Sequence, residues 1–165
     1  GDILLVKKTD ISDTDTAETL MAKLASLGAE ALLEYLDELE SGKVTRIAQD
    51  SSKATYFPML SKADGLINWN ASAEETDRLI RGVTPWPGAY THRCGKTLKV
   101  HKAYPADAES GLCAGTIIKA DKTGIYVACG KGTLVLTDVQ LEGKKRMCCA
   151  DFLNGCRICT GEVLG

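Results

Sequence analysis

Five short β-type runs in the C-terminal half of the chain constrain its fold more than any other feature. Tight turn sequences such as "CGK", "DKTG" and "GKG" separate these runs. Five short strands at regular spacing predict a small closed barrel, and the OB type of five-stranded Greek-key barrel is expected. A last helix is predicted at about residues 149–154. The five runs are "AYTHR", "KTLKVHKAY", "GTIIKAD", "GIYVACG" and "TLVLTDVQL".

The first 42 residues have a different pattern. Apolar residues Ile3 to Val6 form a run typical of a buried strand, which requires neighbouring strands. Leucines then recur at helical spacing until Gly28, which predicts one helix, and a second leucine stripe from residue 31 to residue 39 predicts another. The N-terminal part therefore reads as a strand followed by two helices. Because it begins inside an element, the chain is expected to be a piece of a longer protein.

Residues 43–70 lose periodicity and gain Ser, Asp and Pro, which predicts a linker between two bodies. Its aromatic residues Tyr56, Phe57 and Trp69 predict that it packs along a surface. Residues 71–165 are then expected to form the C-terminal domain. They begin with a capping box at Ser72 and Glu75, which predicts a short helix.

Cysteine content and hydropathy narrow the class of protein. The seven cysteines form an odd set without a disulfide framework, and no apolar run approaches the length of a membrane span, so a cytoplasmic protein is expected. Four of the cysteines cluster near the C-terminus and could supply thiolates to zinc. Packing of free thiols is the favoured interpretation, and no metal site is assigned. The clustered cysteines are Cys148, Cys149, Cys156 and Cys159.

Charge is distributed unevenly along the sequence. Residues 1–42 carry three lysines against ten acidic residues, whereas the remaining residues carry 17 basic and 12 acidic ones. Two interpretations of the basic part remain open: an ordinary solvated surface, or a surface that faces a polyanion such as nucleic acid. The adjacent charges of Lys144, Lys145 and Arg146 are the most specific local signal.

No catalytic arrangement is evident in the residues. His92 and His101 lie on predicted strands without a Cys or Ser partner at a familiar spacing. The glycines of "ACGKGTL" lack the phosphate-loop pattern and predict a hairpin turn. No catalytic residue is therefore assigned.

Several stretches, in this order and at matching spacing, together resemble the methionyl-tRNA formyltransferase family along nearly the whole chain. Asn68 departs from the family pattern, which has Asp before the Trp. The stretches are "GDILL", "DTAETLMAKLASLGAEALLEYL", "QDSSKATYFPMLSKADGLINW", "RLIRGVTPWPGAYT" and "LEGKKRMCCADFLNG".

The resemblance implies an α+β chain: the end of a Rossmann-like catalytic domain over 1–42, the linker, and an OB-like barrel over 71–165. It implies transfer of a formyl group from 10-formyltetrahydrofolate to initiator methionyl-tRNA in translation initiation. The family's catalytic Asn, His and Asp would precede Gly1, so the chain alone is expected to bind tRNA without catalysis or a cofactor of its own. The tRNA-binding residues that the resemblance and the charge pattern indicate are Lys62, Arg81, Lys144, Lys145 and Arg146.

Two alternatives remain open. The chain could be the C-terminal part of another enzyme of the formyltransferase type. That enzyme could be a formyltransferase that acts on an amino sugar, or it could be a folate dehydrogenase. Neither enzyme would need the basic run. It could also be a stand-alone OB-type nucleic-acid-binding module. As a piece of a catalytic domain, residues 1–42 are expected to expose apolar faces, which either a second copy of the chain or rearranged packing would cover.

Overall fold

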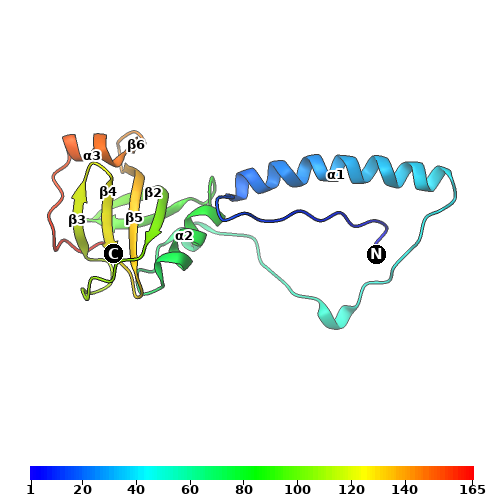
Figure 1. Ribbon diagram of the computed structural model, residues 1–165, viewed down its shortest axis with the longest axis horizontal. Coiled ribbons are helices and arrows are strands. Elements are labelled where there is room, and N and C mark those ends of the chain that lie inside the picture. Colours follow the sequence, from blue (N-terminus) through cyan, green and yellow to red (C-terminus); the bar gives the residue numbers. More distant parts are fainter. The chain divides into compact units, whose positions relative to one another are not determined.

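The computed structural model describes residues 1–165 and divides into two compact units, Gly1–Met59 and Leu60–Gly165. Figure 1 shows the helices and strands of both units along the chain. The mixed α/β content agrees with the predicted class. None of the helices combines the length and the hydropathy that a membrane-spanning helix requires.

The Gly1–Met59 unit contains one long helix, α1 (Ala17–Glu40), and a short 3-10 turn, η1 (Ser51–Lys53). Thr16 begins α1 through a capping box, because its hydroxyl accepts from Thr19 N while Thr19 Oγ1 accepts from Thr16 N. The prediction of two helices is wrong. Gly28 costs about 1 kcal/mol relative to Ala inside a helix, and the Ala- and Leu-rich neighbours on both sides keep the helix continuous.

The predicted opening strand does not form either. Ile3 makes an isolated antiparallel bridge with Ile47, with N–O distances of 2.8 and 3.0 Å, and residues 4–6 pair with no neighbouring strand. Tyr56 and Phe57 are 88% and 84% exposed, so the prediction that they pack along a surface is wrong as well.

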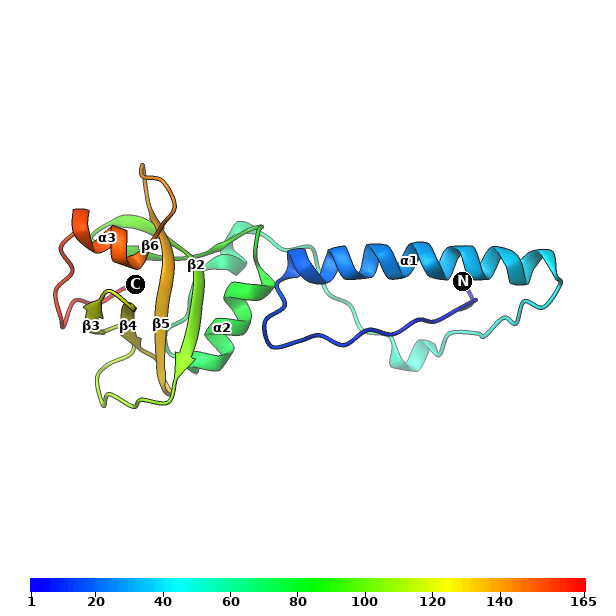
Figure 2. The same cartoon turned by 45° about the horizontal axis from the view of Figure 1, so that its top comes forward.

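The Leu60–Gly165 unit is built on an antiparallel sheet with the order β1-β2-β5-β4-β3, in which β6 also pairs with β5. All five predicted strands are confirmed, and Figure 2 shows α3 beside β6. The elements of this unit are η2 (Lys62–Gly65), α2 (Ala73–Gly82), β1 (Ala89–Arg93), β2 (Lys96–Ala106), β3 (Ile117–Asp121), β4 (Gly124–Ala128), β5 (Thr133–Leu141), β6 (Met147–Cys148) and α3 (Cys149–Gly155).

A single apolar core lies inside this unit. Strands β4 and β5 contribute Ile125, Leu134 and Leu136, all fully buried, and α2 contributes Ile80. Trp69 is also buried, and its Nε1 donates to Thr91 Oγ1 at 3.0 Å, which satisfies the ring nitrogen inside the core. Of the three aromatic residues predicted to pack, Trp69 is the one that does.

The C-terminal residues lie beside the outer strand β3 and also reach β1. Ile117 N donates to Glu162 O at 2.7 Å, and Leu164 N donates to Gly115 O at 2.9 Å. Gly165 N donates to His92 O of β1 at 3.0 Å. The two outer strands of the sheet, β3 and β1, therefore both hydrogen-bond the same terminal segment.

Candidate nucleic-acid interface

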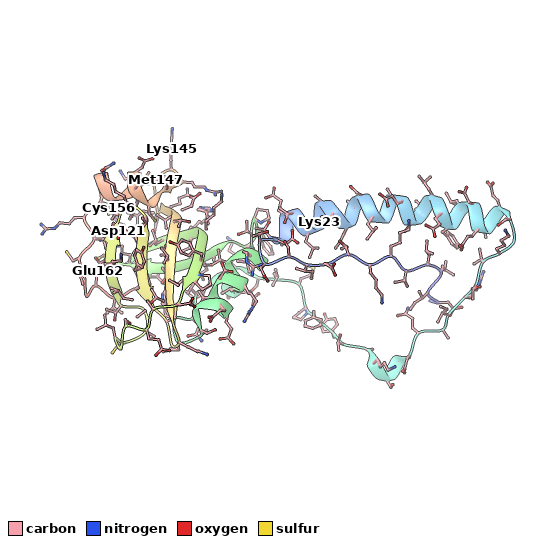
Figure 3. All side chains as sticks on the ribbon, in the orientation of Figure 1. Lys23, Asp121, Lys145, Met147, Cys156 and Glu162 are labelled. Atoms are coloured by element: carbon pink, nitrogen blue, oxygen red, sulfur yellow. The ribbon has the colours of Figure 1, made fainter.

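The turn between β5 and β6 presents the predicted basic run Lys144-Lys145-Arg146. Strand pairing of Asp138 with Cys148 and of Val139 with Met147 forms the base of this hairpin. Lys144 and Lys145 are both exposed and make no ion pair. Figure 3 shows Lys145 extending outward from the fold.

Hydrogen bonds fix the backbone of this turn. Lys144 N donates to Leu141 O at 2.9 Å, and Gln140 Nε2 donates to Lys144 O at 3.0 Å. Glu142 joins the turn to β2, because its N–H donates to Thr97 O at 2.8 Å and its carboxylate accepts from Thr97 N at 3.0 Å. Gly143 has φ of 73°, a left-handed conformation that favours glycine. The two lysines therefore extend from a backbone held at several points.

His101 supports the same turn from β2. Its Nε2 lies 3.2 Å from Gln140 Oε1, and because Gln140 Nε2 is a donor to Lys144 O, His101 donates this bond. Burial lowers the pKa of His101, and nearby Arg146 lowers it further, against the raising effect of the Gln140 bond. The imidazole is thus neutral at pH 7 and acts as a support without adding charge.

Arg146 is less available than the two lysines. It forms a bidentate ion pair with Asp138, with Nη2 2.6 Å from Oδ2 and Nε 3.0 Å from Oδ1. This bond raises the pKa of Arg146 above its usual value. Because Asp138 balances its charge, Arg146 fixes the hairpin more than it attracts a polyanion.

A depression of about 320 Å³ adjoins the basic turn. It is shallow and has both polar and apolar walls, with a positive charge from Lys99 and a negative charge from Glu142. A depression with these groups can accommodate a phosphate or sugar edge. Its lining residues are Thr97, Lys99, Gln140, Leu141, Glu142 and Gly143.

The other two predicted residues lie outside the hairpin. Lys62 is exposed at the start of η2. Arg81 lies in the last turn of α2 and is half-buried, with Nε 2.9 Å from Asp77 Oδ2. The structure therefore brings three of the five predicted residues into one turn and leaves Lys62 and Arg81 on separate elements.

Sequence reasoning missed a partly buried ion pair that holds the C-terminal segment. Arg93 Nη2 donates to Glu162 Oε2 at 3.1 Å and to Arg157 O at 2.8 Å. Its Nε lies 2.7 Å from Glu162 Oε1 without the alignment of a hydrogen bond. Burial raises the pKa of Glu162, but Arg93 outweighs it and the net shift is downward. These residues are 69 positions apart, so no local signal in the sequence could have paired them.

The clustered cysteines lie in different surroundings. Cys149 is buried, with Sγ 2.9 Å from Leu136 O, and burial raises the pKa of its thiol to about 12. Cys148 is exposed and contacts Asp151, whereas Cys156 accepts from Arg93. No group of three or more ligand-type side chains is arranged to hold a metal ion.

Two cavities of the chain, the depression near the basic turn and a larger one, do not fit a folate. The larger one, about 780 Å³, is lined by residues 1–3 and 48–54 and offers Ile3 as its one large apolar side chain. A pteridine ring requires apolar or aromatic walls with a few convergent polar groups, which neither this cavity nor the depression near the basic turn supplies. No step through a folate is assigned to these residues.

Comparison with solved structures supports the fold. The chain is similar to HypX from Aquifex aeolicus, with a TM-score of 0.66 over 93% of this chain and 28% of that one, at 17% identity. A second HypX structure, in complex with tetrahydrofolic acid, has a TM-score of 0.56 over 75% of this chain and 22% of that one, at 19% identity. At these identities the similarity shows the fold alone.

Comparison with the sequences of known proteins identifies the family, which the similarity of the fold does not. The methionyl-tRNA formyltransferase of Geobacter metallireducens is 46% identical over 165 residues, and that of Geotalea uraniireducens is 42% identical over 165 residues. Each match covers 100% of this chain and 52% of the relative, so the chain spans about half the length of the curated relatives it matches. Residues 59–157 match the family model described as formyl transferase, C-terminal domain. The chain therefore belongs to the formyl transferase family and contains its C-terminal domain.

Proposed function

We propose that this chain is the tRNA-binding part of a methionyl-tRNA formyltransferase. The observation that carries the proposal is the β5–β6 turn, where Lys144 and Lys145 extend unpaired from a hydrogen-bonded backbone. The similarity to proteins named methionyl-tRNA formyltransferase, along the whole chain, supports a tRNA as the polyanion.

Lysine side chains suit this role because a phosphate contact requires charge more than exact geometry. Each lysine that neutralises a phosphate releases counterions and makes binding depend on salt. Contacts of this kind set the position and orientation of the RNA without reading its sequence. Lys62 adds a third free charge in η2, whereas Arg81 and Arg146 contribute less because Asp77 and Asp138 balance them.

The proposal assigns a role to each of the three predicted parts of the sequence. Residues 1–42 belong to the catalytic domain of the longer enzyme, residues 43–70 connect it, and residues 71–165 form the tRNA-binding domain. Burial of Ile67 and Trp69 in the Leu60–Gly165 unit extends the packed region into the end of the connection.

In the full enzyme, 10-formyltetrahydrofolate would supply the formyl group and methionyl-tRNA would receive it, in the cytoplasm. The amine must lose a proton as it attacks the formyl carbon, and the oxyanion requires positioned donors. His92 and His101 are the chain's only histidines, and the neutral His101 is occupied by Gln140. The chemistry is therefore assigned to the rest of the enzyme, and this chain binds and orients the tRNA.

The OB-like barrel is part of the same proposal. Hydrogen bonds from the terminal segment to Gly115 beside β3 and to His92 of β1 support a barrel whose last side is formed by residues 161–165. A closed barrel removes the unpaired edges that an open sheet would present.

Self-association completes the proposal for the isolated chain. The exposed leucines of α1 include Leu32, Leu33 and Leu39, at 57%, 66% and 50% exposure, and a second copy would cover them in the absence of the rest of the enzyme. Sedimentation velocity across a concentration series tests this point, and a single monomeric species at every concentration would contradict it.

The decisive experiment is fluorescence anisotropy of labelled initiator tRNA titrated with the 165-residue chain at two or more salt concentrations. The double variant Lys144→Ala/Lys145→Ala should weaken binding and lower the salt slope by about 0.7 to 0.9 per lysine. The matched control is Lys122→Ala/Lys131→Ala, which removes two exposed lysines from other turns. Loss of binding only in the first variant supports the proposal. Equal loss in both, or no binding at low salt, overturns it.

A further inference from the structure

Trp86 has an unusual position for a tryptophan. Its side chain is 56% exposed, whereas Trp69, the only other tryptophan, is 5% exposed and belongs to the core. An indole that is more than half exposed gains only part of the free energy that full burial would give, and tryptophan is enriched where a protein contacts a partner.

The loop that carries Trp86 is held in place on both sides. Gly88 N donates to Val83 O at 2.9 Å, and Thr84 Oγ1 donates to Ile80 O at 2.7 Å, so the loop closes on the end of α2. Pro85 and Pro87 flank the tryptophan and fix their own φ angles. An indole on a restrained loop loses little conformational entropy when a partner stacks on it.

The two elements next to this loop, η2 and α2, carry basic residues. A side chain at Gly65, the last residue of η2, would meet the carbonyl oxygen of Gly88, so η2 lies directly against the loop. Lys62 begins η2 and is exposed, and the last turns of α2 carry Arg78 and Arg81 on one face. Three of the acidic neighbours have partners of their own. Asp77 pairs with Arg81, and Asp64 accepts from Ser61 N at 2.6 Å. Glu75, which lies near Arg78, accepts from Ser72 N at 2.9 Å.

We propose that the Trp86 indole stacks on an unpaired base of the bound RNA, with Lys62 and Arg78 contacting the adjacent phosphates. An aromatic face among positive charges is the arrangement that binds single-stranded nucleic acid, because every base has a π-face and every nucleotide a phosphate. This inference rests on the proposed tRNA binding and adds a stacking residue to it.

Tryptophan fluorescence of the 165-residue chain tests the stacking directly. Trp69 is buried and Trp86 is exposed, so quenchers dissolved in the buffer act mainly on the emission of Trp86. An unmodified initiator tRNA transcript should quench Trp86 emission and protect it from acrylamide. A blunt-ended RNA duplex of equal length, which lacks unpaired bases, should do neither to the same degree. Trp86→Phe should abolish the tRNA-dependent change, since only Trp69 then reports.

Affinity gives a second and independent readout. Stacking of one base is worth about 1–3 kcal/mol, so Trp86→Ala should weaken tRNA binding about 5- to 150-fold. The slope of log K against log salt should stay unchanged, because no charge is lost. The matched control is Tyr104→Ala, which removes another exposed aromatic residue, at 45% exposure, from strand β2.

The outcomes separate this inference from the proposed function. Salt-dependent tRNA binding without quenching, and with the Trp86→Ala variant binding as tightly as the parent, overturns the stacking and leaves the lysine contacts standing. Equal quenching by the blunt duplex also overturns it, because no unpaired base is then involved. Absence of any tRNA binding by the parent chain overturns both proposals. Circular dichroism of the variants checks that each remains folded.

Discussion

The two units of this chain have equally clear local signals and very different cores. α1 begins with a capping box at Thr16, and α2 begins with one at Ser72. Yet α1 buries none of its residues, whereas the Leu60–Gly165 unit contains every buried apolar residue of the chain. The one buried residue of Gly1–Met59 is a carboxylate, Asp15.

The difference shows that capping and propensity decide where a helix begins, while burial decides whether it persists. Most helical stability in proteins comes from packing of an apolar face, and an unpacked helix is marginal in water. The leucines of α1 have the spacing of such a face, but Leu24, Leu33 and Leu36 remain 48%, 66% and 43% exposed. The Leu60–Gly165 unit should therefore carry nearly all of the chain's stability.

Separate expression of the two units should give the largest effect. A fragment of residues 60–165 should unfold cooperatively with a free energy of about 5–15 kcal/mol, as a single domain does. A fragment of residues 1–59 should show no cooperative transition, because its helix lacks a core. Thermal and urea melts followed by circular dichroism measure both.

Hydrogen exchange on the intact chain provides the control for this pair. Amides of β5 should exchange by global unfolding, whereas those of α1 should exchange by local opening at much lower free energy. Equal protection in the two regions would show that α1 is stabilised by contacts within the chain, and the contrast between the units would then fail.

Truncation of one leucine in each unit should give the next largest effect. Leu136 is fully buried in β5, so Leu136→Ala should cost about 2–5 kcal/mol through lost burial and a cavity. Leu33→Ala removes a side chain that is 66% exposed and should change the free energy of unfolding by less than about 0.5 kcal/mol. Urea unfolding of the two variants beside the parent chain gives both values, and a large cost at Leu33 would reveal a hidden partner of α1.

Gly124 in the sheet and Gly28 in α1 sharpen the comparison between the two units. Substitution by alanine should destabilise the structure at Gly124 and stabilise it at Gly28. A side chain at Gly124 would lie 2.6 Å from Leu136 O and from Val135 Cγ1, so Gly124→Ala should destabilise the sheet. Nothing lies within 4 Å of the corresponding point at Gly28, and Gly28→Ala should raise the helicity of α1 by removing a penalty of about 1 kcal/mol. Helical signal at 222 nm and the urea midpoint measure the two effects; helicity unchanged by Gly28→Ala would contradict the second.

The sheet could be predicted from the sequence because its signals are local. The strands are short apolar or alternating runs, and turns with Gly and Lys separate them: buried and less buried residues alternate at the start of β1, whereas β4 and β5 are buried along most of their length. The helix start at Ser72 was equally readable, since its capping box lies within four residues.

The predictions for the N-terminal residues failed because a local pattern in the sequence does not by itself decide whether a helix continues or a strand finds a partner. Gly28 predicts an interruption of the helix, but a single glycine does not outweigh the helix formers around it. Residues 3–6 have the composition of a buried strand, and only Ile3 pairs, because a strand forms when a neighbour hydrogen-bonds it.

The basic turn was identified from its charges, but the availability of each charge depends on contacts that the sequence does not show. Asp138 lies eight residues before Arg146 and reaches it only because the hairpin register brings β5 and β6 together. The same register places Gln140 and Glu142 where they hold the turn. The sequence could thus indicate which residues are positive and could not indicate which of them are unpaired.

A fall in pH should have the smallest of these effects on stability, and it should act at the start of α1, in the Gly1–Met59 unit. Asp15 Oδ2 accepts from Lys23 Nζ at 2.7 Å and from Ser12 N at 2.8 Å, and its Oδ1 accepts from Thr19 Oγ1 at 3.0 Å. Lys23 first, and then Ser12, hold the pKa of Asp15 well below its usual range. A carboxyl whose folded pKa is depressed stabilises the fold above its unfolded pKa, about 3.9, and loses that contribution as the pH falls through the folded pKa.

The helix start should therefore stay ordered as the pH falls to about 4 and loosen only below it. Carbon-detected NMR titration of the Asp15 carboxyl measures the midpoint, and the Thr19 amide reports the helix start. Lys23→Ala removes the largest cause and should move the Asp15 midpoint back toward the ordinary aspartate value, so that loosening begins at higher pH. An Asp15 midpoint at the ordinary value in the parent chain would show that this contact does not persist in solution. The N-terminal unit would then lack even the one buried contact that distinguishes its helix start from the rest of α1, and its contrast with the C-terminal core would be greater still.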